Sequence, residues 1–235
     1  MKRRALIVGA AYNDPDIPGV YTDLVAWDAF LKSACGGAWD TEEVETLKDP
    51  SLKDLNPALR RLAEVDYSFV VFCGHGATVD LGKPWTETIL CFGTHGEVSD
   101  SQLNPGTPRC TMLLDCCRGL ISLSDEQRFL IEGKAASAVD RRGARSAYDE
   151  ALELAEKGLV TIFAASVGEE ASDRRSFSKQ LILQAESVMA AHEGILPQSL
   201  AVELTAQAMK ITTPQQHPEY NGGRRLHHFP FAINV

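Results

Sequence analysis

The chain has 235 residues, of which 44% are hydrophobic and 23% are charged. These proportions are typical of a globular domain with a substantial core, and they exclude disorder, collagen and coiled coil as the overall class. The formal net charge of −9 argues against a nucleic-acid-binding surface and suits a substrate that carries positive charge.

The first residues do not predict a signal peptide. Basic residues stand at positions 2–4, but the apolar run at 5–11 is too short for the hydrophobic region of such a peptide. No stretch approaches the roughly 20 apolar residues of a membrane-spanning helix. The six cysteines form no C-x-x-C pair, so we expect no bound metal. Because no signal peptide or membrane-spanning segment is predicted, we expect reduced thiols in a cytoplasmic protein that does not bind membranes.

Short apolar runs alternate with segments of helical periodicity along the chain. We predict strands at 4–9, 44–47, 67–73, 110–115, 160–165 and 229–235, and a small hairpin at 89–92 and 96–98. Helices are predicted at 21–33, 56–65, 177–191 and 198–210. The second helix is expected to begin with Asn56 as its N-cap and Pro57 in its first turn.

Nearly continuous apolar strands that alternate with helices are typical of a parallel sheet covered on both faces. We therefore expect an α/β fold, a three-layer α/β/α sandwich around a mostly parallel six-stranded sheet, in a single domain over residues 1–235. Residues 122–150 are charged and contain no good strand, so they are predicted to form a surface loop or linker with some helix.

Two of the predicted buried strands end in chemically reactive residues. In open parallel sheets, functional sites lie beyond the carboxyl ends of the strands. His75 stands between two glycines just after strand 67–73, and Cys117 follows strand 110–115. A cysteine nucleophile needs a histidine within hydrogen-bond reach, because the thiolate is the reactive form. If the two strands are neighbours, His75 and Cys117 can face each other across the top of the sheet.

Together these segments resemble the caspase and metacaspase family of cysteine peptidases. Residues 115–119, Asp-Cys-Cys-Arg-Gly, stand in register with the caspase signature Gln-Ala-Cys-Arg-Gly, which has a histidine about 50 residues upstream. Residues 72–76, Phe-Cys-Gly-His-Gly, are similar to the metacaspase segment Tyr-Ser-Gly-His-Gly. Both alignments place the nucleophile at Cys117. By this resemblance the chain divides into large-subunit-like residues 1–121, a linker at about 122–156 and small-subunit-like residues 157–235.

The resemblance implies a cysteine endopeptidase with a caspase-like fold that works with a Cys–His dyad and requires no cofactor. Cys117 would attack the scissile carbonyl, and His75 would manage the proton that goes to the leaving amine. The backbone N–H groups of Gly76 and Cys117 would form the oxyanion hole, as in the family.

The residue two positions before the nucleophile carries the specificity in this family. Caspases have Gln there and bind Asp through arginines, whereas this chain has Asp115. A carboxylate at the base of the first specificity pocket favours a cationic side chain, as in metacaspases, so we expect cleavage of a protein substrate after Arg or Lys. The resemblance adds Asp23 and Cys73 to this pocket, while Val20 stands where the family has a cysteine. The alternative for Asp23 is a solvated helix residue.

Regulation is also implied by the resemblance alone. The family cuts itself in the linker, so Arg141, Arg142 and Arg145 are candidate autoprocessing sites, although a solvated basic loop is the simpler interpretation. Calcium dependence is left open, because the acidic residues have no calcium-loop spacing. Those residues are Asp14, Asp16, Glu42, Glu43 and Glu45. A small effector that activates a partner protein in cell death or defence, as a monomer or homodimer, is the biology that the family suggests.

Two other interpretations compete with the peptidase. A catalytically silent caspase-like module could bind or regulate a partner, although such a module has no need of both Cys117 and His75. A nucleotide-binding enzyme is disfavoured because residues 9–11 lack the G-x-G-x-x-G spacing and no P-loop motif occurs. Taken singly, Gly-His-Gly is more often a turn and a strand-end cysteine is more often packed in the core.

Overall fold

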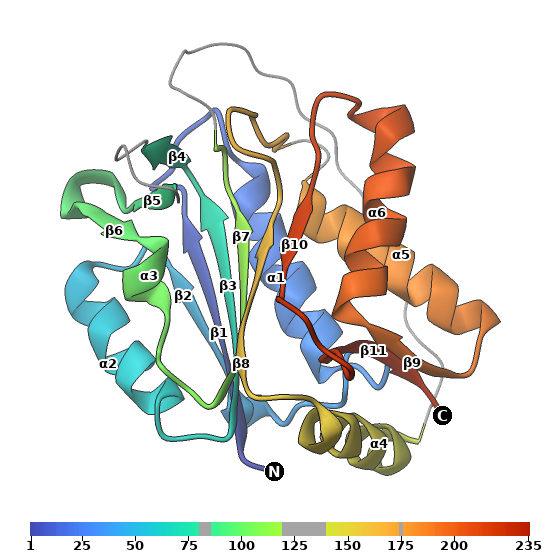
Figure 1. The fold of residues 1–235 in the computed structure, drawn as a ribbon. Coiled ribbons are helices and arrows are strands. Elements are labelled where there is room, and N and C mark those ends of the chain that lie inside the picture. The colour runs from blue at the N-terminus through green and yellow to red at the C-terminus, as the bar shows by residue number, and fades with distance from the viewer. Residues whose placement is uncertain (80–85, 119–139, 174–175) are drawn as a thin grey trace.

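The computed structural model describes residues 1–79, 86–118, 140–173 and 176–235. Within these residues, the strands of the main sheet are β1 (Arg3–Ala10), β2 (Val44–Lys48), β3 (Tyr67–Gly74), β7 (Arg109–Asp115), β8 (Gly158–Phe163) and β10 (Glu219–Asn221). Their order across the sheet is β10-β8-β7-β3-β1-β2 (Figure 1). Strands β8, β7, β3, β1 and β2 pair in parallel, and β10 is antiparallel to β8. This arrangement confirms the predicted fold class.

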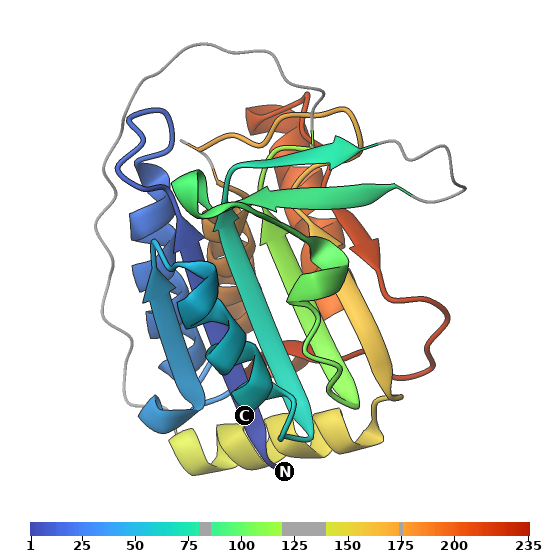
Figure 2. The ribbon, with the colours of Figure 1, turned by 90° about the vertical axis from the view of Figure 1, so that its left-hand side faces the viewer.

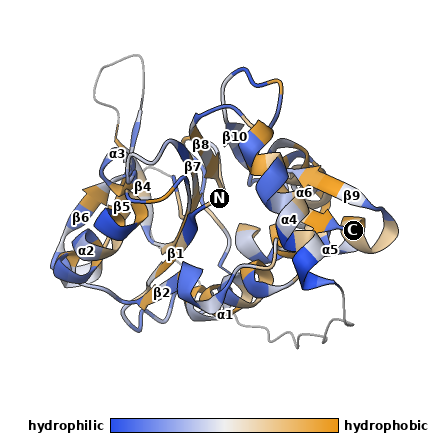
Figure 3. Cartoon of the chain, turned by 90° about the horizontal axis from the view of Figure 1, so that it is seen from below, coloured by the Kyte–Doolittle hydropathy of each residue, from blue (hydrophilic) through white to orange (hydrophobic). Residues whose placement is uncertain are grey.

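Helices cover both faces of the main sheet, as the view from below shows (Figure 3). Two lie on one face, α2 (Leu52–Leu62) and α3 (Asp100–Leu103), and three lie on the other, α1 (Gly19–Lys32), α5 (Phe177–Ala191) and α6 (Gln198–Thr212). Helix α4 (Arg141–Leu154) crosses the amino ends of the strands, at the bottom of Figure 1. Among the helices of the described residues, none is both long enough and apolar enough to cross a bilayer.

In the part of the chain that the structure describes, two small sheets accompany the main one. The first contains β4 (Gly76–Val79), β5 (Glu87–Cys91) and β6 (Glu97–Ser99), with the short helical turn Gly93–His95 between the last two. It lies across the carboxyl ends of the main strands (Figure 2). The second pairs β9 (Gly194–Pro197) with β11 (Pro230–Asn234). The predicted last strand therefore exists, but it pairs with β9 because β10 already occupies the edge of β8.

The main strands bury side chains on both faces, because successive residues of a strand point to opposite sides of the sheet. Leu6 and Phe72 pack in the cluster that includes α2, while Ile7 and Phe69 pack in the cluster that includes α1. The ring of Trp27 on α1 lies 5.7 Å from the ring of Phe69, measured between centroids. These two cores hold the strands rigidly and therefore fix the residues at the strand ends.

The start of α2 differs from the prediction. We expected Asn56 and Pro57 to open the helix, but it begins at Leu52, and Pro57 lies inside it. Ser51 precedes the helix and forms a capping box with Asp54, in which each side chain bonds to the backbone N–H of the other residue. This pair satisfies the first amide groups of the helix more than a turn earlier than the expected start, which extends the helix toward the N-terminus.

Candidate active site

The candidate nucleophile and base lie at the ends of neighbouring strands. Strands β3 and β7 pair in parallel with Cys73 opposite Asp115. His75 and Cys117 each lie two residues beyond this last paired position, past the carboxyl ends of β3 and β7. The parallel arrangement that the sequence analysis required is therefore present.

Gly76 brings the two strand ends into direct contact. A Cβ atom added to Gly76 would lie 2.7 Å from Cys116 Sγ and 3.1 Å from the carbonyl oxygen of Cys117. The first distance is shorter than real Cβ atoms tolerate and the second is tighter than most of their contacts, so a larger residue would push the two segments apart. The segment that carries His75 is thus packed against the segment that carries Cys117.

The Cys117 thiol is half-buried and bonded to the loop between β8 and α5. The Ala171 amide donates a hydrogen bond to Cys117 Sγ at 3.3 Å, and Sγ in turn lies 3.7 Å from the Ala171 carbonyl oxygen. Burial raises the pKa of the Cys117 thiol, and the amide hydrogen bond opposes that rise only in part. The resting side chain is therefore the neutral thiol, which needs a base to become a nucleophile.

His75 has a carboxylate partner that the sequence analysis did not identify. Its Nε2 atom lies 3.0 Å from Oδ2 of Asp14, in the loop between β1 and α1. The amide of Asp16, and then the bond with His75, hold the pKa of Asp14 below its ordinary value, so Asp14 is ionised at neutral pH. This contact orients the ring and leaves Nδ1 as the nitrogen that can accept a proton. The available signal was that Asp14, too, follows the carboxyl end of a buried strand.

The three predicted pocket residues come together from three elements. Asp23 of α1, Cys73 of β3 and Asp115 of β7 each contribute a side-chain atom, and these atoms lie within 4.8 Å of one another. We term these residues the acidic cluster. Their fractional exposures are 2%, 1% and 8%, so Asp23 is not a solvated helix residue. The start of α5 covers them, since the Ser178 amide donates to Asp115 at 2.8 Å and the Ser176 hydroxyl donates to Asp23 at 2.9 Å.

Ionising the acidic cluster is unfavourable. Burial, followed by the charge of Asp115, raises the pKa of Asp23 to about 8, and burial also raises the pKa of Asp115. A further carboxyl, Asp173 in the loop before α5, adds repulsion to both. Lys179 of α5 counters it, with Nζ 3.6 Å from Asp23 Oδ1. Two carboxylates and a thiolate are also a ligand set for a cation such as Zn²⁺. A cysteine ligand must be deprotonated, however, and burial raises the pKa of the Cys73 thiol well above its usual range, which disfavours metal binding here.

The fold and the two strand ends now point to one family. The sequence profile of the caspase domain matches residues 2–213. The chain belongs to the caspase domain family. Members of this family are cysteine peptidases, hydrolases that act on protein substrates and can be dimeric.

One solved structure similar to this caspase domain is caspase-1 from Spodoptera frugiperda. The two chains are 14% identical and superpose with a TM-score of 0.56, over 94% of this chain and 86% of the other. At this identity the similarity shows the caspase fold and says nothing of specificity. No curated protein sequence matches the chain.

Arg118 anchors the residue after the candidate nucleophile of this caspase domain. The arginine is 4% exposed, and its guanidinium donates to the Ala165 carbonyl oxygen at 3.2 Å and to the Glu219 carboxylate at 2.8 Å. Its amide also donates to the carbonyl oxygen of Glu169 at 2.9 Å. These bonds connect the end of β7 to β10 and to the loop after β8. The signature arginine thus has a supporting role that the motif alone did not reveal.

The three predicted autoprocessing arginines lie at the opposite end of the sheet from Cys117 (Figure 1). They are Arg141, Arg142 and Arg145. We expected a loop or linker with some helix here, and the structure has the first turns of α4. Arg145 is paired with Glu43 at 2.6 Å, so the helix must open locally before this site could be cut. The first part of the predicted linker, residues 122–139, lies outside the described residues.

The acidic residues considered for calcium do not gather in one place. Asp14 and Asp16 follow the carboxyl end of β1. Glu42, Glu43 and Glu45 lie at the amino end of β2. Because β1 and β2 are parallel neighbours, the two groups occupy opposite ends of the sheet and cannot share one ion.

Proposed function

We propose that this caspase domain is a cysteine endopeptidase with Cys117 as nucleophile and His75 as base. The observation that carries the proposal is the meeting of two strand ends: β3 and β7 are parallel neighbours, and Gly76 lets the segments after them touch. Family membership supports the same chemistry, because caspase domains are cysteine peptidases.

The proposed reaction has two halves. His75 Nδ1 takes the proton of Cys117 while Sγ bonds to the scissile carbonyl carbon, and the carbonyl electron pair moves onto oxygen. The N–H groups of Gly76 and Cys117 would stabilise this oxyanion. The C–N bond then breaks as His75 gives its proton to the leaving amine. Water, activated by His75, hydrolyses the thioester and restores the thiol. Throughout, Asp14 would orient the ring and stabilise its protonated form.

The specificity that we propose is for Arg or Lys immediately before the scissile bond. Its support is the acidic cluster, which lies at the end of β7 that also carries Cys117. Buried carboxylates attract a cation strongly, because low dielectric strengthens the interaction between opposite charges. A basic substrate side chain would relieve the repulsion between Asp23 and Asp115.

The biological role that we propose is limited proteolysis of a partner protein, which would activate that partner in a cell-death or defence response. The support is the requirement for a basic residue, since such specificity restricts cleavage to a few exposed sites. This role depends on the two preceding proposals.

The test is a set of fluorogenic peptides that differ only in the residue before the scissile bond: Arg, Lys, Asp or Leu. We expect cleavage after Arg and Lys, and its loss in both Cys117→Ala and His75→Ala. Cys91→Ser is the matched control, because Cys91 is a partly buried thiol on β5 that takes no part in the proposed reaction. Parallel assays with and without calcium measure its contribution.

Each part of the proposal has its own contrary result. Cleavage that survives in Cys117→Ala would exclude the dyad. Cleavage only after Asp or Leu would exclude the basic specificity and leave the dyad standing. A folded protein that cleaves no peptide under either condition would favour the silent binding module.

A further inference from the structure

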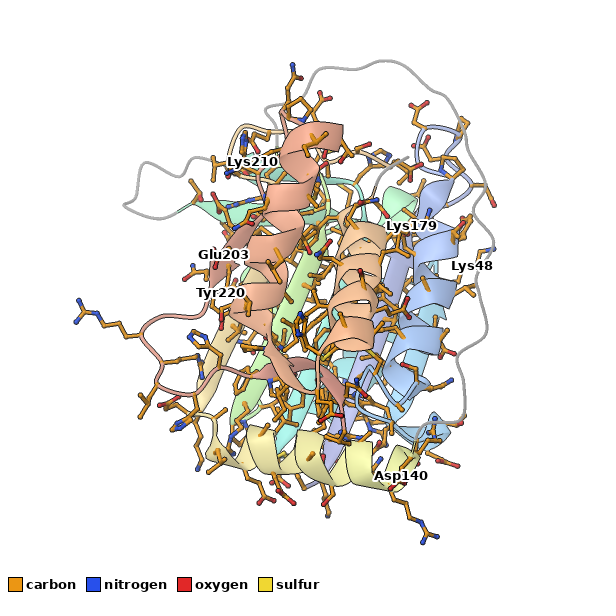
Figure 4. The ribbon with its side chains drawn as sticks, turned by 90° about the vertical axis from the view of Figure 1, so that its right-hand side faces the viewer. Lys48, Asp140, Lys179, Glu203, Lys210 and Tyr220 are labelled. Atoms are coloured by element: carbon orange, nitrogen blue, oxygen red, sulfur yellow. The ribbon has the colours of Figure 1, made fainter. Side chains whose placement is uncertain are left out.

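Lys179 places its ammonium group beside the acidic cluster. The residue stands in the first turn of α5, where its amide bonds to the Ser176 hydroxyl and its side chain extends toward α1 (Figure 4). Its Nζ lies 3.6 Å from Asp23 Oδ1. Burial raises the pKa of Asp23, Asp115 and Asp173, and the charge of Lys179 opposes this rise at all three.

The position of Lys179 creates a conflict with the proposed substrate. Three carboxyl groups face this one ammonium, and the side chain of Lys179 is only 19% exposed. Asp23 and Asp115 are themselves almost inaccessible beneath the start of α5. A basic substrate side chain would need the same carboxylates that Lys179 already compensates.

We infer that Lys179 is an internal competitor for the specificity pocket, and that the Arg or Lys side chain of a substrate binds the acidic cluster by displacing the Lys179 ammonium. The inference rests on the proposed specificity for basic residues. A lysine suits this role because its ammonium is a point charge on a flexible four-carbon stem, which can move outward while the helix backbone stays in place. In the absence of substrate, the same ammonium limits repulsion among the carboxylates.

The inference predicts which variant should bind better. Lys179→Met removes the competing charge and keeps a side chain of similar length, while Lys179→Arg keeps the charge. Both are made in the Cys117→Ala protein, so that binding is measured without turnover. The probes are N-acetyl-arginine methylamide and its citrulline counterpart, which has nearly the same shape but no charge.

In calorimetric titrations at about pH 9, above the pKa of about 8 of Asp23, we expect Lys179→Met to bind the arginine probe at least about tenfold more tightly than the parent. The citrulline probe should bind both proteins equally, and Lys179→Arg should resemble the parent. The pH at which arginine binding appears should be higher in Lys179→Met, because loss of the ammonium favours the protonated carboxyls. A residue that only packed against the acidic cluster, without acting through its charge, would not move this midpoint.

Two results overturn the inference, and they differ in what else they overturn. If the arginine probe outcompetes citrulline equally in parent and Lys179→Met, the pocket takes cations but Lys179 does not compete for it. If arginine and citrulline bind alike in both proteins, the acidic cluster is not a specificity pocket and the proposed basic preference also fails. Thermal denaturation checks the fold, and Lys179→Gln replaces the methionine variant if that protein does not fold.

Discussion

Replacing Asp23 by Asn should stabilise the protein, and by more as the pH rises. Burial, followed by the charge of Asp115, raises the pKa of Asp23 from 3.8 to about 8. The folded chain therefore keeps a proton that the unfolded chain releases. For this reason the free energy of unfolding falls as the pH rises from about 4 to about 8. Asparagine has no such proton, and its Oδ1 can still accept the hydrogen bond from Ser176.

The size of the effect follows from the pKa. A shift of about four pK units corresponds to at most about 6 kcal/mol of lost stability above about pH 8. Two effects reduce the gain in the variant: Asp115 shares the protonation, and Lys179 loses its counter-ion at a cost of about 1–2 kcal/mol. We expect Asp23→Asn to raise the free energy of unfolding by about 2–3 kcal/mol at about pH 8 and by almost nothing at about pH 4.

Urea denaturation at about pH 4, 6 and 8 measures this difference. Asp28→Asn is the matched control, because Asp28 lies on the same helix, is partly exposed and pairs with Lys32 in the neighbouring turn. Its effect should be small at every pH. The reasoning is refuted if Asp23→Asn is less stable than the parent at about pH 8, or if its gain is the same at all three values.

Three further predictions concern the site. Asp14→Asn should lower kcat/KM about threefold, because the pair that Asp14 forms with His75 is half-exposed and screened. Asp16→Asn should leave kcat/KM unchanged, and equal losses in the two variants would exclude positioning of His75 by Asp14. Gly76→Ala should lower kcat/KM about a hundredfold by displacing the chain near Cys117, and near-normal kinetics would contradict the contact. Arg118→Met should lower the urea-derived free energy of unfolding by about 2–3 kcal/mol, and an unchanged value would show that its buried bonds are dispensable.

The sequence predicted the main sheet because its strands are unusually apolar. The segment 67–73 is buried at every residue, so its composition identifies it as a central strand without periodicity. Strand β10 was missed because Glu-Tyr-Asn is short and polar, as befits an edge strand that needs no second covered face. Strand β4 was missed because it is only four residues long and begins with Gly76, which packs against the segment that follows β7.

The sequence predicted those residues of the candidate site that directly follow a recognisable strand, and it missed those that a loop or helix packing brings there. His75 and Cys117 each follow a strong strand, so their positions could be inferred from two local motifs. Asp14 reaches His75 through a loop whose conformation no periodicity encodes. Asp173 and Lys179 belong to the loop before α5 and to its first turn, and they meet the acidic cluster only because α5 packs against α1.

The pairing of β7 with β8 has a consequence for chain continuity. These two strands flank residues 119–139 in sequence, yet they are parallel neighbours along six residues, from Arg109 opposite Gly158 to Leu114 opposite Phe163. Arg118 adds its own bonds to the loop after β8 and to β10. The pairing of β7 with β8 and the bonds of Arg118 therefore hold Cys117 in place, and the covalent connection between the two strands is not needed for this. Two separately made fragments, divided between these strands, should reassemble into one domain by strand complementation.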